Sequence, residues 1–215
     1  MKLASILALR CLLALPLYAG ASSAAAENST ETKSRAPAFV LSSQAVEDGG
    51  NLPVEYTGDG ESATLPLAWS GAPAGTKSFA LIMHHIAPDK TKWYWIIYNI
   101  PSKTKKLPKN VKGVGVLGNN SVNGRTEYAP PHSKGPGKKK YIYTLYALSS
   151  RPRMEVKPGE VSREALLSAM KGQILGTATL SVIYERFISS EDGESRSDPD
   201  NGRGEPPPPS PGDGR

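Results

Sequence analysis

The chain has 215 residues, a formal net charge of +6 and a single cysteine, with 38% hydrophobic and 21% charged residues. That cysteine, Cys11, lies within an apolar run at the amino terminus, so a mature chain without this run has no thiol. The composition of the mature chain therefore excludes a disulfide framework and a thiolate metal site. Without the two terminal segments described below, about 160 residues are left, enough for one domain with a sizeable core.

Residues 1–26 have the pattern of a secretory signal peptide. A basic start precedes an apolar run from Leu3 to Tyr18, and the small residues before Glu27 suit signal peptidase. The run is interrupted by Arg10 and Pro16 and is shorter than the ~20 residues of a spanning helix, so removal is favoured over a permanent anchor. We therefore expect an exported protein, either periplasmic or extracellular.

The following segment, 27–38, is expected to be a linker. Beyond it, short runs rich in aromatic and β-branched residues predict strands. These runs are Phe79 to Met83, Tyr94 to Ile100, Tyr141 to Leu148 and Thr177 to Tyr184. Glycine and proline clusters between the runs supply turns, so the pattern predicts a mainly β, antiparallel sandwich or barrel. An oligonucleotide-binding barrel remains an alternative at this point.

One helix is predicted near the end of the core. Ser162 has the side chain of an amino-terminal cap, the helix is expected over Arg163 to Lys171, and Gly172 can end it. Its apolar side chains recur on one face. The helix is therefore expected to lie at the periphery of the β domain.

The carboxyl-terminal segment, 189–215, has no Val, Ile, Leu or aromatic residue and contains an unbroken proline run, Pro206 to Pro209. Such a segment cannot bury enough apolar surface to fold, so we expect a disordered tail rich in Pro, Gly and acids. The proline run leaves open a role as a polyproline ligand.

The charge of the remaining core, 27–188, is more positive than that of the whole chain. Of the total formal charge of +6, the signal accounts for +2, and the tail, with seven acids against three arginines, accounts for −4. The core alone therefore has a formal charge of +8. A basic core favours anionic partners such as phosphates, nucleic acid or acidic lipid surfaces.

Several motifs follow one another in a fixed order along the core. They are Leu52-Pro53 with Tyr56–Gly60, Leu65–Pro73, Ser78–Met83 with Ala87-Pro88, Trp93–Pro101, and Tyr128–Pro131 followed by Tyr141–Leu148. In order and spacing these motifs resemble the phosphatidylethanolamine-binding protein family, specifically its bacterial Raf-kinase-inhibitor-like branch. The resemblance implies an antiparallel β-sandwich of this type over 39–188, with a peripheral carboxyl-terminal helix and a small pocket at the sheet edge for phosphate-like groups.

The chain departs from the family pattern in that pocket. The family usually has Asp-Pro-Asp-Ala-Pro where this chain has His84-His85-Ile86-Ala87-Pro88. Tyr94 stands where the family has a histidine, and Lys139-Lys140-Tyr141 stands where it has His-Arg-Tyr. Both carboxylates are replaced, so the pocket is expected to be more cationic than in relatives.

The candidate ligand-binding residues combine imidazoles, phenol hydroxyls and a proline loop. They are His84, His85, Tyr94, Tyr128, Pro130, Pro131, His132 and Tyr141. Four lysines are expected to form an electrostatic rim that attracts anions, namely Lys134, Lys138, Lys139 and Lys140. Since adjacent strand residues face opposite sides, His84 and His85 share one pocket only if the strand ends at them, which Pro88 favours.

These residues predict a non-enzymatic protein that binds a small anion or a phospholipid headgroup, without a cofactor. No Gly-x-Ser-x-Gly, HExxH or paired carboxylates appear, so no catalytic residue is assigned. A kinase or protease inhibitor-like interaction protein is the alternative, and a metal-dependent enzyme is the weakest reading because two imidazoles and a tyrosine are a poor ligand set. A protein partner and transient contact with a membrane surface stay open, whereas nucleic acid is not expected.

Overall fold

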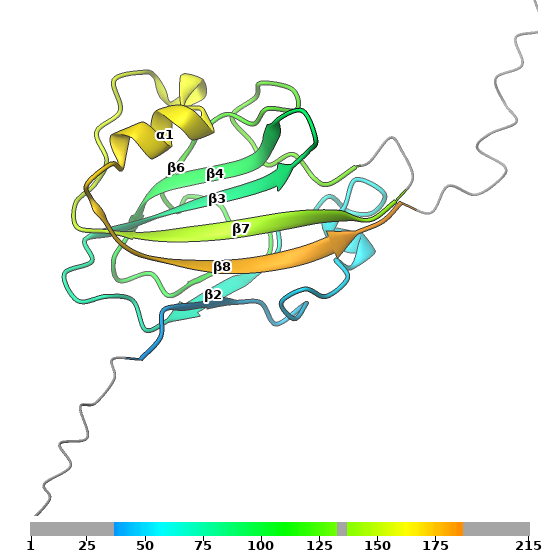
Figure 1. Ribbon diagram of the computed structural model, residues 1–215, viewed down its shortest axis with the longest axis horizontal. Coiled ribbons are helices and arrows are strands. Elements are labelled where there is room, and N and C mark those ends of the chain that lie inside the picture. Colours follow the sequence, from blue (N-terminus) through cyan, green and yellow to red (C-terminus); the bar gives the residue numbers. More distant parts are fainter. Residues whose placement is uncertain (1–36, 133–136, 187–215) are drawn as a thin grey trace, which may run out of the picture. The chain divides into compact units, whose positions relative to one another are not determined.

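The computed structural model describes residues 37–132 and 137–186, which form two antiparallel sheets and one α-helix (Figure 1). The predicted signal peptide, most of the linker and the predicted tail lie outside the described residues. The three-stranded sheet has the order β1 (Val40–Ser42), β2 (Leu67–Ser70), β5 (Lys106–Leu107). The five-stranded sheet has the order β6 (Val116–Leu117), β4 (Thr91–Pro101), β3 (Ser78–Ile86), β7 (Lys139–Leu148), β8 (Ile174–Tyr184).

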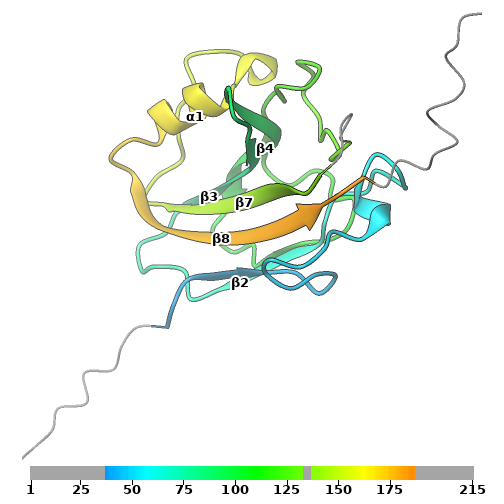
Figure 2. The same ribbon diagram turned by 45° about the vertical axis from the view of Figure 1, so that its right-hand side comes forward.

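The five-stranded sheet is covered on both faces, which explains why its central strands are continuously apolar. Phe79, Leu81 and Met83 of β3 belong to the core shared with the three-stranded sheet. Ala80 and Ile82 point the other way and belong to the core beneath α1 (Arg163–Ala169). Figure 2 shows α1 on one side of the sheet and β2 on the other. The predicted β-sandwich with a peripheral helix is confirmed, and each predicted strand lies within a longer observed one.

The helix α1 begins where its cap predicts. The Ser162 hydroxyl accepts a hydrogen bond from the Ala165 amide at 3.2 Å, and Leu166 is fully buried against the sheet. The last helical residue is Ala169, two residues before the predicted end, because Met170 already serves as the carboxyl-terminal cap. Two short 3-10 helices, η1 (Val54–Tyr56) and η2 (Pro158–Glu160), complete the described elements. No helix in the described ranges is long and apolar enough to cross a bilayer.

A β-bulge in β4 turns Tyr94 toward the candidate site. Met83 of β3 pairs with Trp95 and His84 pairs with Trp93, so Tyr94 is an extra residue without a partner on β3. As a result Tyr94 and Trp95 both join the core on the sandwich side of the sheet, although they are neighbours in sequence. The bulge thus brings the Tyr94 ring next to Tyr141 of β7, the strand that pairs with the other edge of β3.

The expectation that β3 ends at the two histidines is wrong. The strand continues to Ile86, and His84, His85 and Ile86 pair with Trp93, Lys92 and Thr91 of β4. The alternation of strand side chains therefore holds through both histidines and sends them to opposite faces.

Candidate anion-binding site

A cavity of about 630 Å³ lies at the end of the five-stranded sheet where β3 ends and β4 and β7 begin. We call it the lysine-rimmed cavity, since its lining includes Lys90, Lys92 and Lys139 together with His85 and His132. No Asp or Glu is among the described residues that line it. The formal charge of the lining is therefore positive, and anions are attracted to it.

His85 forms part of the lining on the sandwich side of β3. Its Nδ1 lies 2.8 Å from the Lys140 carbonyl oxygen, and its ring packs against Tyr141 with centroids 5.4 Å apart. Because a carbonyl oxygen only accepts, Nδ1 carries the hydrogen in this contact. The other ring nitrogen, Nε2, then becomes a donor when the imidazole is protonated, so the charged ring is the form that can donate to an anion.

Tyr94 and Tyr141 form an aromatic wall of the same cavity. Their ring centroids lie 5.0 Å apart at an interplanar angle of 75°, so the two rings meet edge to face. Burial raises the pKa of both phenols, so both remain protonated at neutral pH. A protonated phenol can donate a hydrogen bond, so the two hydroxyls supply candidate donors to a ligand in the cavity.

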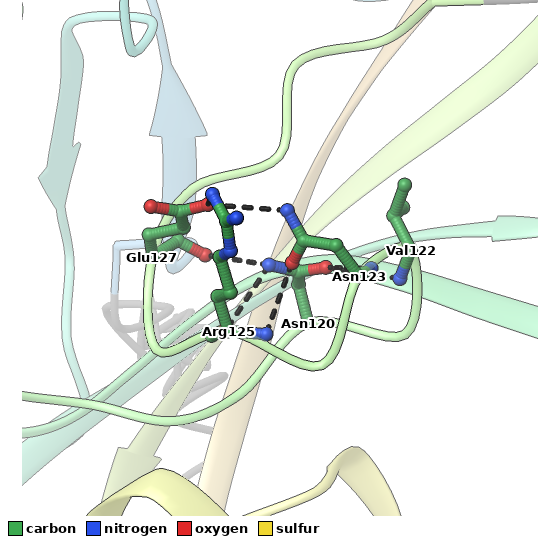
Figure 3. Close-up of polar contacts among 5 residues, drawn as sticks. All are labelled: Asn120, Val122, Asn123, Arg125 and Glu127. Atoms are coloured by element: carbon green, nitrogen blue, oxygen red, sulfur yellow. Dashed lines mark hydrogen bonds and ion pairs between the residues drawn. The ribbon is translucent and has the colours of Figure 1, made fainter.

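A loop organised by Asn120 contributes Ser121 and Val122 to the lining, and Figure 3 shows the polar contacts within it. Its side-chain oxygen accepts from the amides of Val122 and Asn123, both at 2.9 Å, and its amide group donates to the Arg125 carbonyl at 3.0 Å. Asn120 is only 1% exposed, so these bonds satisfy backbone groups that would otherwise lose their partners. The side chain thereby fixes the conformation in which Val122 lines the cavity.

Ser121 attaches this loop to β4. The Trp93 amide donates to the Ser121 hydroxyl at 2.8 Å, and the Ser121 amide donates to the Trp93 carbonyl at 2.8 Å. The Ala129 amide donates to the Tyr94 carbonyl at 2.8 Å and closes the loop at its other end. The loop therefore follows the bulged part of β4 and keeps a fixed distance from the tyrosines.

His132 lines the cavity and packs closely against Gly58. The Gly58 amide donates to the Pro131 carbonyl at 2.8 Å, and a Cβ atom at position 58 would lie 2.4 Å from His132 Nδ1, so only glycine fits. His132 Nδ1 lies 3.5 Å from an Asp59 carboxylate oxygen, and Arg186 Nε lies 3.3 Å from the same oxygen. The charge of Asp59 is thus compensated at the side of the cavity.

His84, by contrast, does not line the lysine-rimmed cavity. It faces the side of the sheet that α1 covers, where burial first, and then nearby Arg163 and His85, lower its pKa. Its Nδ1 is buried without a hydrogen-bond partner. The structure therefore separates His84 from the other candidate residues.

The remaining candidate residues are distributed around the cavity. Tyr128 packs inside the domain, with its ring 5.5 Å from Trp95 and its hydroxyl 3.0 Å from the Tyr56 carbonyl oxygen, and it does not line the cavity. Pro130 and Pro131 also lie outside the lining and position His132. Of the four predicted rim lysines, Lys139 lines the cavity, Lys138 lines a neighbouring one, Lys140 contributes its carbonyl to His85, and Lys134 lies outside the described residues.

Several site residues were missed from the sequence. Lys90 lies in the turn between β3 and β4, and Lys92 is the second residue of β4. Asn120 precedes Ser121 in a loop that also contains Asn123 and Gly124. The signal for the loop was its turn chemistry, because Asn side chains bond to nearby backbone groups. Among 37–132 and 137–186, no group of three or more His, Cys, Asp or Glu side chains is arranged to hold a metal ion.

Comparison with protein families supports the same reading of the fold. The model of the phosphatidylethanolamine-binding protein family matches residues 42–185. A UPF0098 protein of Methanothermobacter thermautotrophicus is 38% identical over 151 residues, which cover 68% of this chain and 98% of the relative. A UPF0098 protein of Aquifex aeolicus is 34% identical over 150 residues, covering 67% of this chain and 86% of the relative.

Solved structures give the same result. A crystal structure of a phosphatidylethanolamine-binding protein homologue from Chlamydia trachomatis matches with a TM-score of 0.64 at 32% identity, covering 70% of this chain and 99% of that one. Escherichia coli YbcL matches with a TM-score of 0.63 at 24% identity, covering 69% and 99%, which shows a shared fold.

Proposed function

The chain belongs to the phosphatidylethanolamine-binding protein family, and from this we propose that it binds small phosphate-bearing anions, without catalysis, in the lysine-rimmed cavity. Family membership supports a role in binding. The proposal goes further and names the site and the charge of the ligand.

The observation that carries the proposal is the composition of the cavity lining. Three lysines and two histidines meet in about 630 Å³, and none of the described lining residues is acidic. Positive charges on one concave surface raise the local concentration of anions, and the effect weakens with added salt. A cationic or neutral ligand would gain nothing from this arrangement.

The lining also offers hydrogen-bond donors suited to phosphate oxygens. The His85 ring donates from Nε2 when it is protonated, and the phenol hydroxyls of Tyr94 and Tyr141, kept protonated by burial, carry hydrogens that can be donated. Trp93 and Val122 add apolar surface beside these donors. A few convergent polar groups within an otherwise apolar cleft are typical of sites for small molecules.

Titration calorimetry with inorganic phosphate and phosphoethanolamine at low salt tests the proposal. We expect measurable heat for both ligands, with an affinity that falls as salt is raised from about 0.01 M to about 0.15 M, the range over which screening grows strongest. The charge-reversal variant Lys92→Glu should lower the affinity for phosphate at least tenfold.

The matched control is Lys103→Glu, which makes the same change in net charge at an exposed lysine that does not line the cavity. It should change phosphate affinity less than twofold. An absence of heat for wild type at low salt, or an equal loss of affinity in both variants, would remove the basis of the proposal.

A further inference from the structure

The strand β8 ends beside the lysine-rimmed cavity. It runs antiparallel to β7, and its last residue, Tyr184, pairs with Lys139, which lines the cavity. Two residues later, Arg186 Nε lies 3.3 Å from an Asp59 carboxylate oxygen, and the same oxygen lies 3.5 Å from Nδ1 of His132 in the lining. Arg186 is the last of the described residues, so the chain continues from a point next to the cavity.

The segment that follows is acidic. Residues 189–215 contain seven acids and three arginines, and three of the acids, Glu191, Asp192 and Glu194, precede the first of the arginines, Arg196. The cavity has the opposite charge, because three lysines and two histidines line it and none of its described lining residues is acidic. The segment and the cavity are therefore complementary in charge and attract each other.

Carboxylates also suit the hydrogen-bonding groups of the cavity. An ionised carboxylate only accepts hydrogen bonds, as phosphate oxygens do, and charge-assisted bonds from lysine or protonated histidine are the strong ones. The lysines, the protonated His85 ring and the phenol hydroxyls of Tyr94 and Tyr141 can therefore donate to a carboxylate in place of a phosphate. The two kinds of anion compete for the same donors.

The connection is long enough for the acids to reach the cavity. Glu191 lies five residues beyond Arg186, and Glu194 lies eight residues beyond it. At ~3.3 Å per extended residue, the acids can reach roughly 17 Å and 26 Å from Arg186. A short tether also keeps its end at an effective concentration on the order of millimolar. Even a weak pairing therefore competes with a free anion that is more dilute.

We propose that the carboxylates of Glu191, Asp192 and Glu194 bind in the lysine-rimmed cavity when no ligand is present, so that the chain carries its own competitor for the anion site. This inference rests on the proposed function, to which it adds the regulation of the same site. An incoming anion must displace the acidic segment, and the affinity of the intact chain is lower than that of the cavity alone.

Charge removal in the acidic segment tests the competition. In the triple variant Glu191→Gln, Asp192→Asn, Glu194→Gln, the affinity for inorganic phosphate at low salt should rise by about threefold to tenfold in titration calorimetry, because the competitor is lost. The matched control makes the same change in net charge farther along the chain, with Asp200→Asn, Glu205→Gln and Asp213→Asn. Its phosphate affinity should stay within about 1.5-fold of wild type, since these acids lie farther from the cavity along the tether.

A spin label reports the position of the segment directly. Cys11 is the single cysteine, so Cys11→Ser with Ser195→Cys gives one site for a nitroxide label. At low salt and without phosphate, the label should broaden the amide signal of Ser121, which lines the cavity, and spare Lys103, which follows β4 at its other end. Saturating phosphate should restore the Ser121 signal.

Each result decides between the segment and the site. Equal phosphate affinity in wild type and the first triple variant, an equal rise in both triple variants, or broadening of Ser121 that phosphate leaves unchanged overturns the inference. All three results spare the proposed function, because phosphate still binds. An absence of heat in wild type and in both triple variants overturns the proposed function and the inference together.

Discussion

The two faces of the five-stranded sheet place neighbouring histidines in opposite environments. His85 lies on the sandwich side, packs against Tyr141 and lines a cationic cavity. His84 lies on the α1 side, where burial lowers its pKa and favours the neutral ring. The contrast shows that strand alternation, and not closeness in sequence, decides which imidazole can meet a ligand.

The largest expected effect concerns the α1 face. Leu166→Ala removes a fully buried side chain from the core that α1 forms with β3 and β4, so it should lower the free energy of unfolding by about 3 kcal/mol. Urea denaturation measures this loss. If the two faces have separate roles, the folded variant keeps wild-type affinity for phosphate; a tenfold loss would show that the faces are coupled.

The loop that Asn120 organises should show the next largest effect. Asn120→Ala removes a buried side chain that bonds to four backbone groups of the loop, so we expect a loss of about 2 kcal/mol in the free energy of unfolding. Its effect should differ from that of Leu166→Ala, because phosphate affinity falls as well.

The matched control for the loop is Asn123→Ala, an exposed residue whose side chain accepts from the Arg125 amide. It should cost less than about 1 kcal/mol, because water can replace its partners. Equal losses in Asn120→Ala and Asn123→Ala would contradict the central place of Asn120 in the loop.

Replacing His85 and His84 in turn compares the two faces of the sheet at neighbouring positions. His85→Phe keeps an aromatic ring against Tyr141 but removes the charged donor, and should weaken binding of sulfate at pH 6 about tenfold, the value of one charge-assisted hydrogen bond. Sulfate is the suitable probe because its own charge is constant in this range. His84→Phe should leave sulfate affinity within twofold of wild type, and the reverse order of effects would exchange the roles of the two faces.

The smallest expected effect is the contribution of His84 to the pH dependence of stability. Its pKa in the folded protein lies below the ordinary value of 6.5, so the unfolded chain takes up a proton first as the pH falls. This contribution to stability is complete above pH 6.5 and is lost as the pH falls from there through the lower pKa of the folded state. The melting temperature of His84→Phe should therefore drop less between pH 7 and pH 5 than that of wild type, and an equal drop would contradict the assignment.

The sequence was a good guide wherever the signal is local. The Ser162 cap needs only its own helix, and the apolar runs around Leu81 and Tyr143 need only a covered sheet, so the helix and the strands were predictable. The motifs also gave the position of the cavity along the chain, near His85 and Tyr141.

The rest depends on pairing between distant segments. The face to which His84 points follows from how far β3 continues along β4, and the inward turn of Tyr94 follows from one unpaired residue in that register. The role of Asn120 depends on the path of a whole loop. None of these features has a signal in a short stretch of sequence.

The most direct test of the central claim is a titration of ¹⁵N-labelled protein with inorganic phosphate at low salt, followed by amide chemical shifts. The account predicts saturable shifts for residues around the lysine-rimmed cavity, such as Trp93, Ser121 and Lys139, and none for Arg163 and Leu166 on the α1 face. Shifts confined to the α1 face, or no saturable shift anywhere, would contradict it.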